Sequence, residues 1–147
     1  MSDEVFDNPT AWVARHIRRY VESGGTRGHT FHGNDALLLT TRGRRTGRLR
    51  RTALYYGRDG ERYVLVATPA RGGGNPSWYL NLRHNPAVVL QVRSDVFAAI
   101  ATPAAASERP RLWRLMVDVF PKYLVYEQRA GRDLAVVVVE RLRRPGV

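Results

Sequence analysis

The stretch ALLLTTRGRRTGRLRRTALYYGRDGERYVLVAT, residues 36–68, decides the fold. Three runs suited to β-strands, at 36–41, 49–57 and 62–68, are separated by turns that contain glycine. The Asp59-Gly60 pair between the second and third runs is a strong hairpin signal. Because strands joined by hairpins pair antiparallel, we expect this stretch to form an antiparallel sheet.

Three further strands are expected beyond this stretch. Residues 87–93 and 96–102 predict a hairpin across Ser94-Asp95, and residues 134–142 predict a last strand rich in valine. About six antiparallel strands with few helices to cover them favour a small barrel, because closure of the sheet removes its exposed edges.

Four helical segments are predicted, at residues 9–23, 75–85, 107–120 and 122–130. Asn8, Asn75 and Ser107 are the expected N-caps. Pro121 separates the last two segments, because proline breaks or restarts a helix. Residues 26–35 are expected to form a loop.

The chain has the length of one ordinary domain. We predict a single mainly β (α+β) domain over residues 1–147, with an amphipathic helix in residues 1–25 and the barrel in residues 36–142. The longest apolar runs are six residues, whereas a membrane-spanning helix needs about 18. Residues 1–4 are acidic in character and precede no apolar segment, so we expect no secretory signal and a cytoplasmic location.

Composition excludes several kinds of site. The sequence contains no cysteine, which excludes disulfides, thiolate metal sites and cysteine nucleophiles. Its four histidines lack metal-ligand spacing, so no metal site is expected. The 24 basic residues outnumber the 13 acidic ones and give a formal net charge of +11. Such a surface attracts nucleic acid, anionic lipid, or a phosphorylated or carboxylated small molecule.

An arginine run lies in the turn between the first two strands. TTRGRRTGRLRR, residues 40–51, places six arginines within ten residues, and Gly43 and Gly47 let the backbone approach a ligand closely. Guanidinium forks and backbone N–H groups are what an anion cradle needs. A solvated basic hairpin is the alternative, and the threonines and paired glycines leave the two interpretations evenly balanced.

Two aromatic segments are further candidates. NPSWYLNL, residues 75–82, predicts a helix whose Trp78 packs either in the core or beside a planar ligand. FPKYLVY, residues 120–126, places Tyr123 and Tyr126 on one helix face. Such tyrosines pack in a core or donate a proton in a pocket, and this segment alone favours the core. No Gly-x-Ser-x-Gly elbow is present, which favours bound-cofactor chemistry.

Taken in order, these motifs resemble the deazaflavin (coenzyme F-420)-dependent nitroreductase and quinone reductase family. The resemblance covers residues 37–91 and rests on LLTTRGRRTG at 38–47, the Asp59-Gly60 turn and the NPSWYLNL helix, with a weaker match at 120–126. It implies a split β-barrel that uses a reduced 8-hydroxy-5-deazaflavin as hydride donor. This coenzyme carries a phosphodiester and a polyglutamate tail, which suits the basic run.

The resemblance also assigns site residues. The implied cofactor-binding positions are Arg44, Arg45, Thr46, Gly47, Arg50, Arg51, Thr52, Ala53, Leu54, Tyr55, Val66, Ala67, Thr68, Pro69, Ser77, Trp78, Tyr79, Leu80 and Asn81. The implied catalytic residues are Tyr123 and Tyr126, beside the acceptor, and Trp78, near the ring system. Two departures from the family pattern are Pro69, which has no N–H, and Phe120, which stands where a tyrosine occurs.

The implied function is an oxidoreductase that transfers hydride from reduced coenzyme F-420 to a small electron-poor acceptor, such as a quinone, a nitroaromatic or an activated enone. One alternative is a non-catalytic basic nucleic-acid-binding module, which the net charge suggests. Against it, no aromatic residues are interleaved with the basic run as stacking platforms, so no nucleic-acid partner is expected. A second alternative is a deazaflavin carrier without turnover.

Two further predictions concern assembly and surface. The first helix carries an apolar stripe with Arg15, Arg18 and Arg19 beside it, which suggests weak, salt-sensitive association with the inner face of an anionic membrane. A helix that simply packs on the barrel is the favoured alternative. Small barrels of this type often form homodimers, and the sequence does not decide whether this one does.

Overall fold

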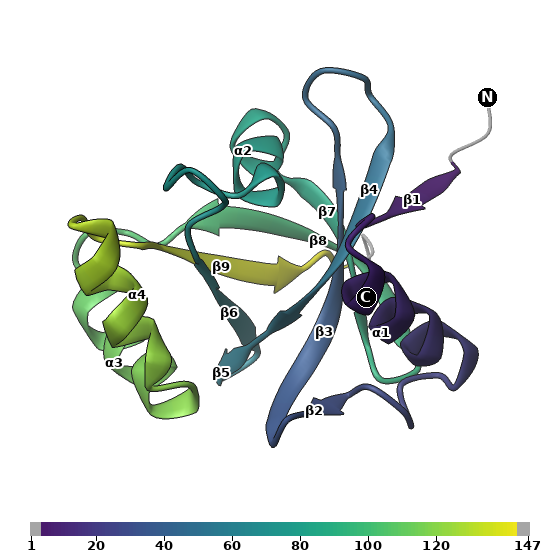
Figure 1. Cartoon of the computed structure of the whole chain (residues 1–147), viewed down its shortest axis with the longest axis horizontal. Helices are drawn as coiled ribbons and strands as arrows, with labels where there is room; N and C mark the ends of the chain where they lie inside the picture. The colour runs from purple at the N-terminus through teal and green to yellow at the C-terminus, as the bar shows by residue number, and fades with distance from the viewer. Residues whose placement is uncertain (1–3, 144–147) are drawn as a thin grey trace.

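The computed structural model describes residues 4–143, in which nine strands form a curved sheet and four helices pack around it (Figure 1). The strands are β1 (Val5–Asp7), β2 (Thr30–Phe31), β3 (Asn34–Arg42), β4 (Leu49–Tyr55), β5 (Gly57–Asp59), β6 (Arg62–Ala67), β7 (Ala87–Val92), β8 (Asp95–Pro103) and β9 (Ala135–Arg141). The helices are α1 (Ala11–Glu22), α2 (Ser77–His84), α3 (Arg109–Val119) and α4 (Lys122–Ala130). Most of the acidic start of the chain and the outer limits of the predicted domain lie outside the described residues.

A short chain connection links strands that lie near opposite ends of the sheet. Its strand order is β1-β4-β3-β7-β8-β9-β6-β5, with β2 paired to β3. All these pairs are antiparallel except β1 with β4, where Val5 lies opposite Leu49 in a parallel pair. The single residue Tyr56 joins β4 directly to β5, at the far end of the strand order. The sheet therefore curls into a split barrel, and the predicted mainly β class is confirmed.

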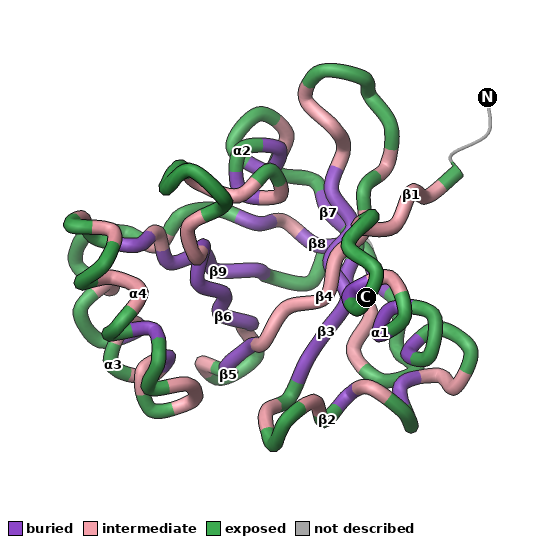
Figure 2. Tube along the Cα trace, in the orientation of Figure 1, coloured by how far each residue is buried: buried purple, intermediate pink, exposed green. Residues whose placement is uncertain are grey.

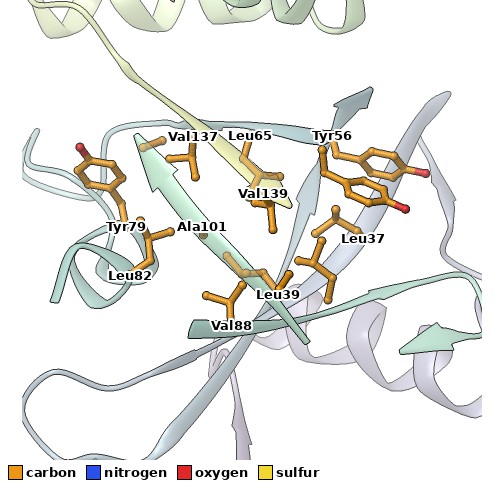
Figure 3. Close-up of a cluster of buried hydrophobic side chains, with 14 of the residues drawn as sticks. Leu37, Leu39, Tyr56, Leu65, Tyr79, Leu82, Val88, Ala101, Val137 and Val139 are labelled. Atoms are coloured by element: carbon orange, nitrogen blue, oxygen red, sulfur yellow. The ribbon is translucent and has the colours of Figure 1, made fainter. Parts of the chain in front are cut away.

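Both faces of the central strands are buried, which explains their almost entirely apolar sequences. On β3, Leu37 and Leu39 point into the barrel, whereas Leu38 between them packs against α1. Strands β6 and β9 repeat this alternation, with one face inside the barrel and the other against α3 and α4. Figure 3 shows Leu37 and Leu39 facing side chains from β6 and β9 in the interior. In Figure 2 the same strands are buried along most of their length, whereas the β3–β4 turn is largely exposed.

The helices cover the barrel from two sides. Helices α3 and α4 lie side by side over β6 and β9, and α1 lies on the other side over β3 and β4 (Figure 1). The buried stripe of α1 includes Ile17 and Tyr20, and the Tyr20 hydroxyl donates a hydrogen bond to the backbone oxygen of Ala36 at 3.0 Å. The apolar stripe is thus packed on the barrel, as the favoured interpretation held. Among residues 4–143, no helix is long and apolar enough to cross a membrane.

Three short strands were not predicted. Strand β1 pairs with residues 44 positions later in the chain, so no local pattern marks it. Strand β2 lies inside the segment expected to be a loop. Strand β5 begins at Gly57, the last residue of the strand predicted at 49–57, and ends at Asp59, which was predicted as part of the turn. Gly57, directly after the break at Tyr56, passes close to α3. A Cβ atom at Gly57 would lie 2.6 Å from Leu115 Cδ2 and 2.7 Å from Met116 Sδ.

The predicted N-caps are wrong. The residues that precede α1, α2 and α3 are Thr10, Pro76 and Glu108, and none makes a side-chain capping hydrogen bond. Asn8 acts one step earlier, because its Oδ1 accepts a hydrogen bond from the backbone N–H of Thr10 at 3.0 Å. The Asn8 side chain therefore stabilises a turn that precedes α1, and it does not cap the first turn of the helix.

Candidate functional site

The candidate site is built around β4. Residues 50–52 of this strand line a cavity of about 500 Å³, and residues 53–55 line a larger cavity of about 830 Å³. We call them the basic cavity and the aromatic cavity. Because consecutive residues of one strand line both, the two cavities adjoin along β4.

The basic cavity lies between the β3–β4 turn, β1 and the start of α2. The predicted cofactor-binding residues that line it are Arg44, Arg45, Thr46, Arg50, Arg51, Thr52, Ser77, Trp78 and Asn81. Phe6 and Asp7 of β1 form a wall that the sequence analysis missed. No sequence signal marked that wall, because it depends on the long-range pairing of β1 with β4.

Asn81 fastens the arginine turn to α2. This side chain is buried, and its Oδ1 accepts hydrogen bonds from the backbone N–H of Arg44 at 3.2 Å and from Arg44 Nη1 at 2.9 Å. Its Nδ2 donates a hydrogen bond to Thr41 Oγ1 at 3.1 Å. Both ends of the amide are engaged with protein groups, so Asn81 holds the turn in place.

The basic cavity carries uncompensated positive charge. Arg51 is neutralised by Asp7, whose two carboxylate oxygens lie 2.6 Å from its Nε and 3.2 Å from its Nη2. Within residues 4–143, by contrast, Arg44, Arg45 and Arg50 form no ion pair with an acidic side chain. Guanidinium groups without acidic partners, beside hydroxyl groups, suit a phosphate or carboxylate ligand.

One wall of the aromatic cavity is made by α4 and β4. Phe120 lies at its centre, with ring centroids of Tyr55, Tyr123 and Tyr126 at 5.1, 5.0 and 6.2 Å. Tyr123 is only 4% exposed, and its hydroxyl has no hydrogen-bond partner within residues 4–143. Burial raises the pKa of Tyr123 well above its ordinary value. The phenol therefore stays protonated at neutral pH and can donate a hydrogen bond to a molecule in the cavity.

The opposite wall was missed by sequence analysis. It consists of Trp12 and His16 from α1 together with Phe31 and His32. The Phe31 ring stacks on His16 with a centroid distance of 4.2 Å and on Trp12 with a distance of 6.0 Å. These residues come from segments interpreted as a packing helix and a loop. The spacing of Trp12 and His16, four residues apart on one helix face, is the one local signal that could have suggested them.

The other predicted residues fall in different places. Those that line the aromatic cavity are Ala53, Leu54, Tyr55, Val66, Thr68, Pro69, Tyr123 and Tyr126. Four predicted positions line neither cavity: Ala67 and Tyr79 are buried in the barrel interior, Leu80 is exposed, and Gly47 lies in the β3–β4 turn. Trp78 lines the basic cavity and packs against the barrel interior, apart from the two tyrosines.

This arrangement accompanies a match to a known family. The model of the F420H(2)-dependent quinone reductase family matches residues 12–141. The chain belongs to this family. It is 33% identical over 143 residues to an F420H(2)-dependent quinone reductase of Mycobacterium tuberculosis (strain H37Rv), a match that covers 88% of this chain and 96% of that protein.

Solved structures agree with membership of the F420H(2)-dependent quinone reductase family. A structure described as a domain-swapped dimer has a TM-score of 0.68 and 32% identity, and the match covers 90% of this chain and 100% of that one. The structure of an F420-H2 dependent reductase has a TM-score of 0.63 and 32% identity, with coverage of 71% and 93%. The protein is therefore an oxidoreductase that uses coenzyme F-420. The comparisons lend no support to a nucleic-acid-binding module or a carrier.

Proposed function

We propose that this F420H(2)-dependent quinone reductase holds the phosphodiester and polyglutamate tail of its cofactor in the basic cavity and reduces a quinone in the aromatic cavity. The observation that carries this proposal is the adjacency of the two cavities along β4. One cavity offers unpaired arginines and the other a buried phenol without a partner. When bound, the reduced deazaflavin supplies a hydride.

The donor set of the basic cavity fits an anionic cofactor. Arg45 and Arg50 offer exposed guanidinium groups for the phosphate and the tail, and Arg44 is held ready by Asn81. The hydroxyls of Thr46 and Ser77 line the same cavity and add further hydrogen-bond donors. Trp78 lies in this cavity too, so its proposed role is to border the cofactor and not the quinone.

The aromatic cavity supplies position and a proton donor. Tyr123 would donate a hydrogen bond to a carbonyl oxygen of the quinone, and its raised pKa keeps that proton in place at neutral pH. Tyr126 and Phe120 pack beside Tyr123 and would align the planar ring. The chain would contribute mainly by holding the quinone close to the hydride donor.

The test follows deazaflavin absorbance after the protein is mixed with reduced coenzyme F-420 and menadione. We expect menadione-dependent oxidation of the cofactor, and the matched variant Tyr123→Phe should be slower without being less stable. Absence of cofactor binding at low salt would refute the proposal. Tight binding without oxidation by any quinone, nitroaromatic or enone would indicate a carrier.

We also propose that residues 1–147 act as one domain and that two chains form a homodimer. The dimer rests on the structure described as a domain-swapped dimer, which is 32% identical to this chain. Light scattering at micromolar concentration should give twice the mass of one chain. The mass of a single chain at every concentration would contradict the dimer.

We further propose a cytoplasmic protein that associates weakly with anionic membranes. The apolar stripe of α1 is buried, but Trp12 is 56% exposed and Arg15, Arg18 and Arg19 are exposed beside it. Arginines and tryptophan are suited to a bilayer interface. The protein should sediment with anionic vesicles at low salt and be released at high salt. Equal sedimentation with neutral vesicles would contradict this proposal.

A further inference from the structure

A third cavity opens beside the aromatic cavity. It has a volume of about 620 Å³, and we call it the annex. Three arginines line the annex: Arg15 and Arg19, one helical turn apart on α1, and Arg27 from the loop that follows. Its other lining residues include Trp12 and Phe31, which also line the aromatic cavity. The two spaces therefore share a wall.

The annex carries positive charge that no protein group neutralises. Within residues 4–143, the guanidinium groups of Arg15, Arg19 and Arg27 make no hydrogen bond and no ion pair, and no acidic residue lines the annex. Elsewhere on the molecule arginines do find acidic partners, as Arg51 does with Asp7 and Arg109 does with Glu127. Three unpaired guanidinium groups around one cavity favour an anionic group inside it.

The shared wall is a stack of aromatic rings. The rings of Trp12 and His16 both stack on Phe31, with interplanar angles of 16° and 17°. His16 is held in this position by a contact of 2.8 Å between its Nε2 and the backbone oxygen of Gly28. Near-parallel rings of this kind suit a planar aromatic ligand. A ring that joins this stack borders both the aromatic cavity and the annex with its three arginines.

We propose that the annex binds an anionic substituent, such as a sulfonate, carboxylate or phosphate, that is carried by the planar acceptor itself. The substrate class of the aromatic cavity then includes quinones with a negatively charged ring substituent. As a statement about the reaction, this rests on the proposed function. As a statement about binding, it does not, because the arginines and the stacked wall belong to this chain alone.

Binding is tested by calorimetry on the cofactor-free protein, with 1,4-naphthoquinone-2-sulfonate as the anionic probe and menadione as the neutral one. We expect the sulfonate to bind more tightly than menadione and to weaken as salt is added. The double variant Arg19→Gln with Arg27→Gln should weaken sulfonate binding about tenfold, because two partly exposed charge contacts are lost. The single variant Arg27→Gln should show a smaller loss in the same direction.

Arg18→Gln is the matched control. Arg18 lies on the same helix, is exposed and lines none of the cavities described above. Its replacement removes one positive charge, as the single variant Arg27→Gln does, and should leave the sulfonate Kd near that of the wild type. In steady-state kinetics, the ratio of the sulfonate KM to the menadione KM should rise in the double variant and not in Arg18→Gln.

Three results would overturn the proposal. They are equal binding of sulfonate and menadione by the wild type, an unchanged sulfonate Kd in the double variant, and the same loss in Arg18→Gln as in the double variant. If the double variant lost sedimentation with anionic vesicles but kept its sulfonate Kd, the arginines would serve a lipid surface instead. Failure of menadione reduction with intact sulfonate binding would refute the proposed function and leave the annex standing.

Discussion

Replacing Asn81 tests whether the arginine turn must be held in position to bind the cofactor. Asn81→Ala removes the hydrogen bonds to the backbone and side chain of Arg44 and to the Thr41 hydroxyl. Each contributes about 0.5–1.5 kcal/mol net, so the free energy of unfolding should fall by about 1.5–4.5 kcal/mol. The cofactor KM should rise about tenfold, because a turn that moves must be ordered again on binding. The kcat should change little, since such contacts act equally in ground and transition states.

Asn81→Asp is the matched variant that keeps the position and changes the charge. A carboxylate accepts both hydrogen bonds from Arg44, and the Thr41 hydroxyl can rotate to donate to it. Its free energy of unfolding should therefore stay within about 1 kcal/mol of the wild-type value. The cofactor KM should nevertheless rise, because the new negative charge neutralises Arg44 beside the anionic ligand.

The assays are urea unfolding and steady-state kinetics with varied cofactor. A wild-type cofactor KM in Asn81→Ala, together with the expected loss of stability, would show that the amide does not position the cradle. A wild-type cofactor KM in Asn81→Asp would show that the charge of Arg44 is not used for binding. A large fall in kcat in either variant would place the amide at the reacting groups, against the reasoning above.

Four further predictions follow from the same structure. The double variant Arg44→Ala with Arg45→Ala should raise the cofactor KM about a hundredfold with little change in kcat. A titration that shows wild-type cofactor affinity would mean that the arginine run is only a solvated hairpin. Tyr123→Phe should lower kcat with menadione about tenfold. Its free energy of unfolding should equal that of the wild type, because the hydroxyl has no protein partner. In the wild type, the raised pKa of Tyr123 should prevent any loss of activity through phenol ionisation up to pH 10. Gly57→Ala should lower the free energy of unfolding by about 1–3 kcal/mol through overpacking. Wild-type stability would mean that α3 shifts to accommodate the added methyl group. Burial lowers the pKa of His29, so its contribution to stability is complete above pH 6.5 and is lost as the pH falls through the folded-state pKa. Between pH 7 and 5, the urea midpoint of His29→Gln should therefore drop less than that of the wild type. An equal drop in both proteins would exclude His29 as a source of the pH dependence.

The elements predicted correctly are those whose signals are local. The hairpin strands and the arginine turn are visible in residues 36–68 because alternation and turn residues lie within a few positions of one another. Strand β1 escaped prediction because it is three residues long and pairs with β4 far along the chain. The annex and the wall around Phe31 escaped for the same reason, since only the packing of α1 on the barrel brings them together.

The site residues show a second limit. Ala67 and Tyr79 stand beside cavity-lining residues in the sequence, yet both point into the barrel. Neighbours on a strand face opposite ways, and neighbours on a helix are turned by about 100°. A contiguous motif therefore cannot present every residue to a ligand, and a resemblance that names the whole motif overstates the contact surface.

The division of the site along β4 has an evolutionary consequence. The basic cavity, proposed for the cofactor, is built mainly from the β3–β4 turn, α2 and β1, whereas the aromatic cavity, proposed for the acceptor, is built mainly from α1, β2 and α4. Strands β3 and β4 contribute lining residues to both cavities. Under the proposed assignment, substitutions in α1, α4 and the short β2 segment can change the range of oxidants without altering the residues that line the basic cavity. For protein engineering, the same division marks α1 and α4 as the segments to diversify when a new acceptor is wanted.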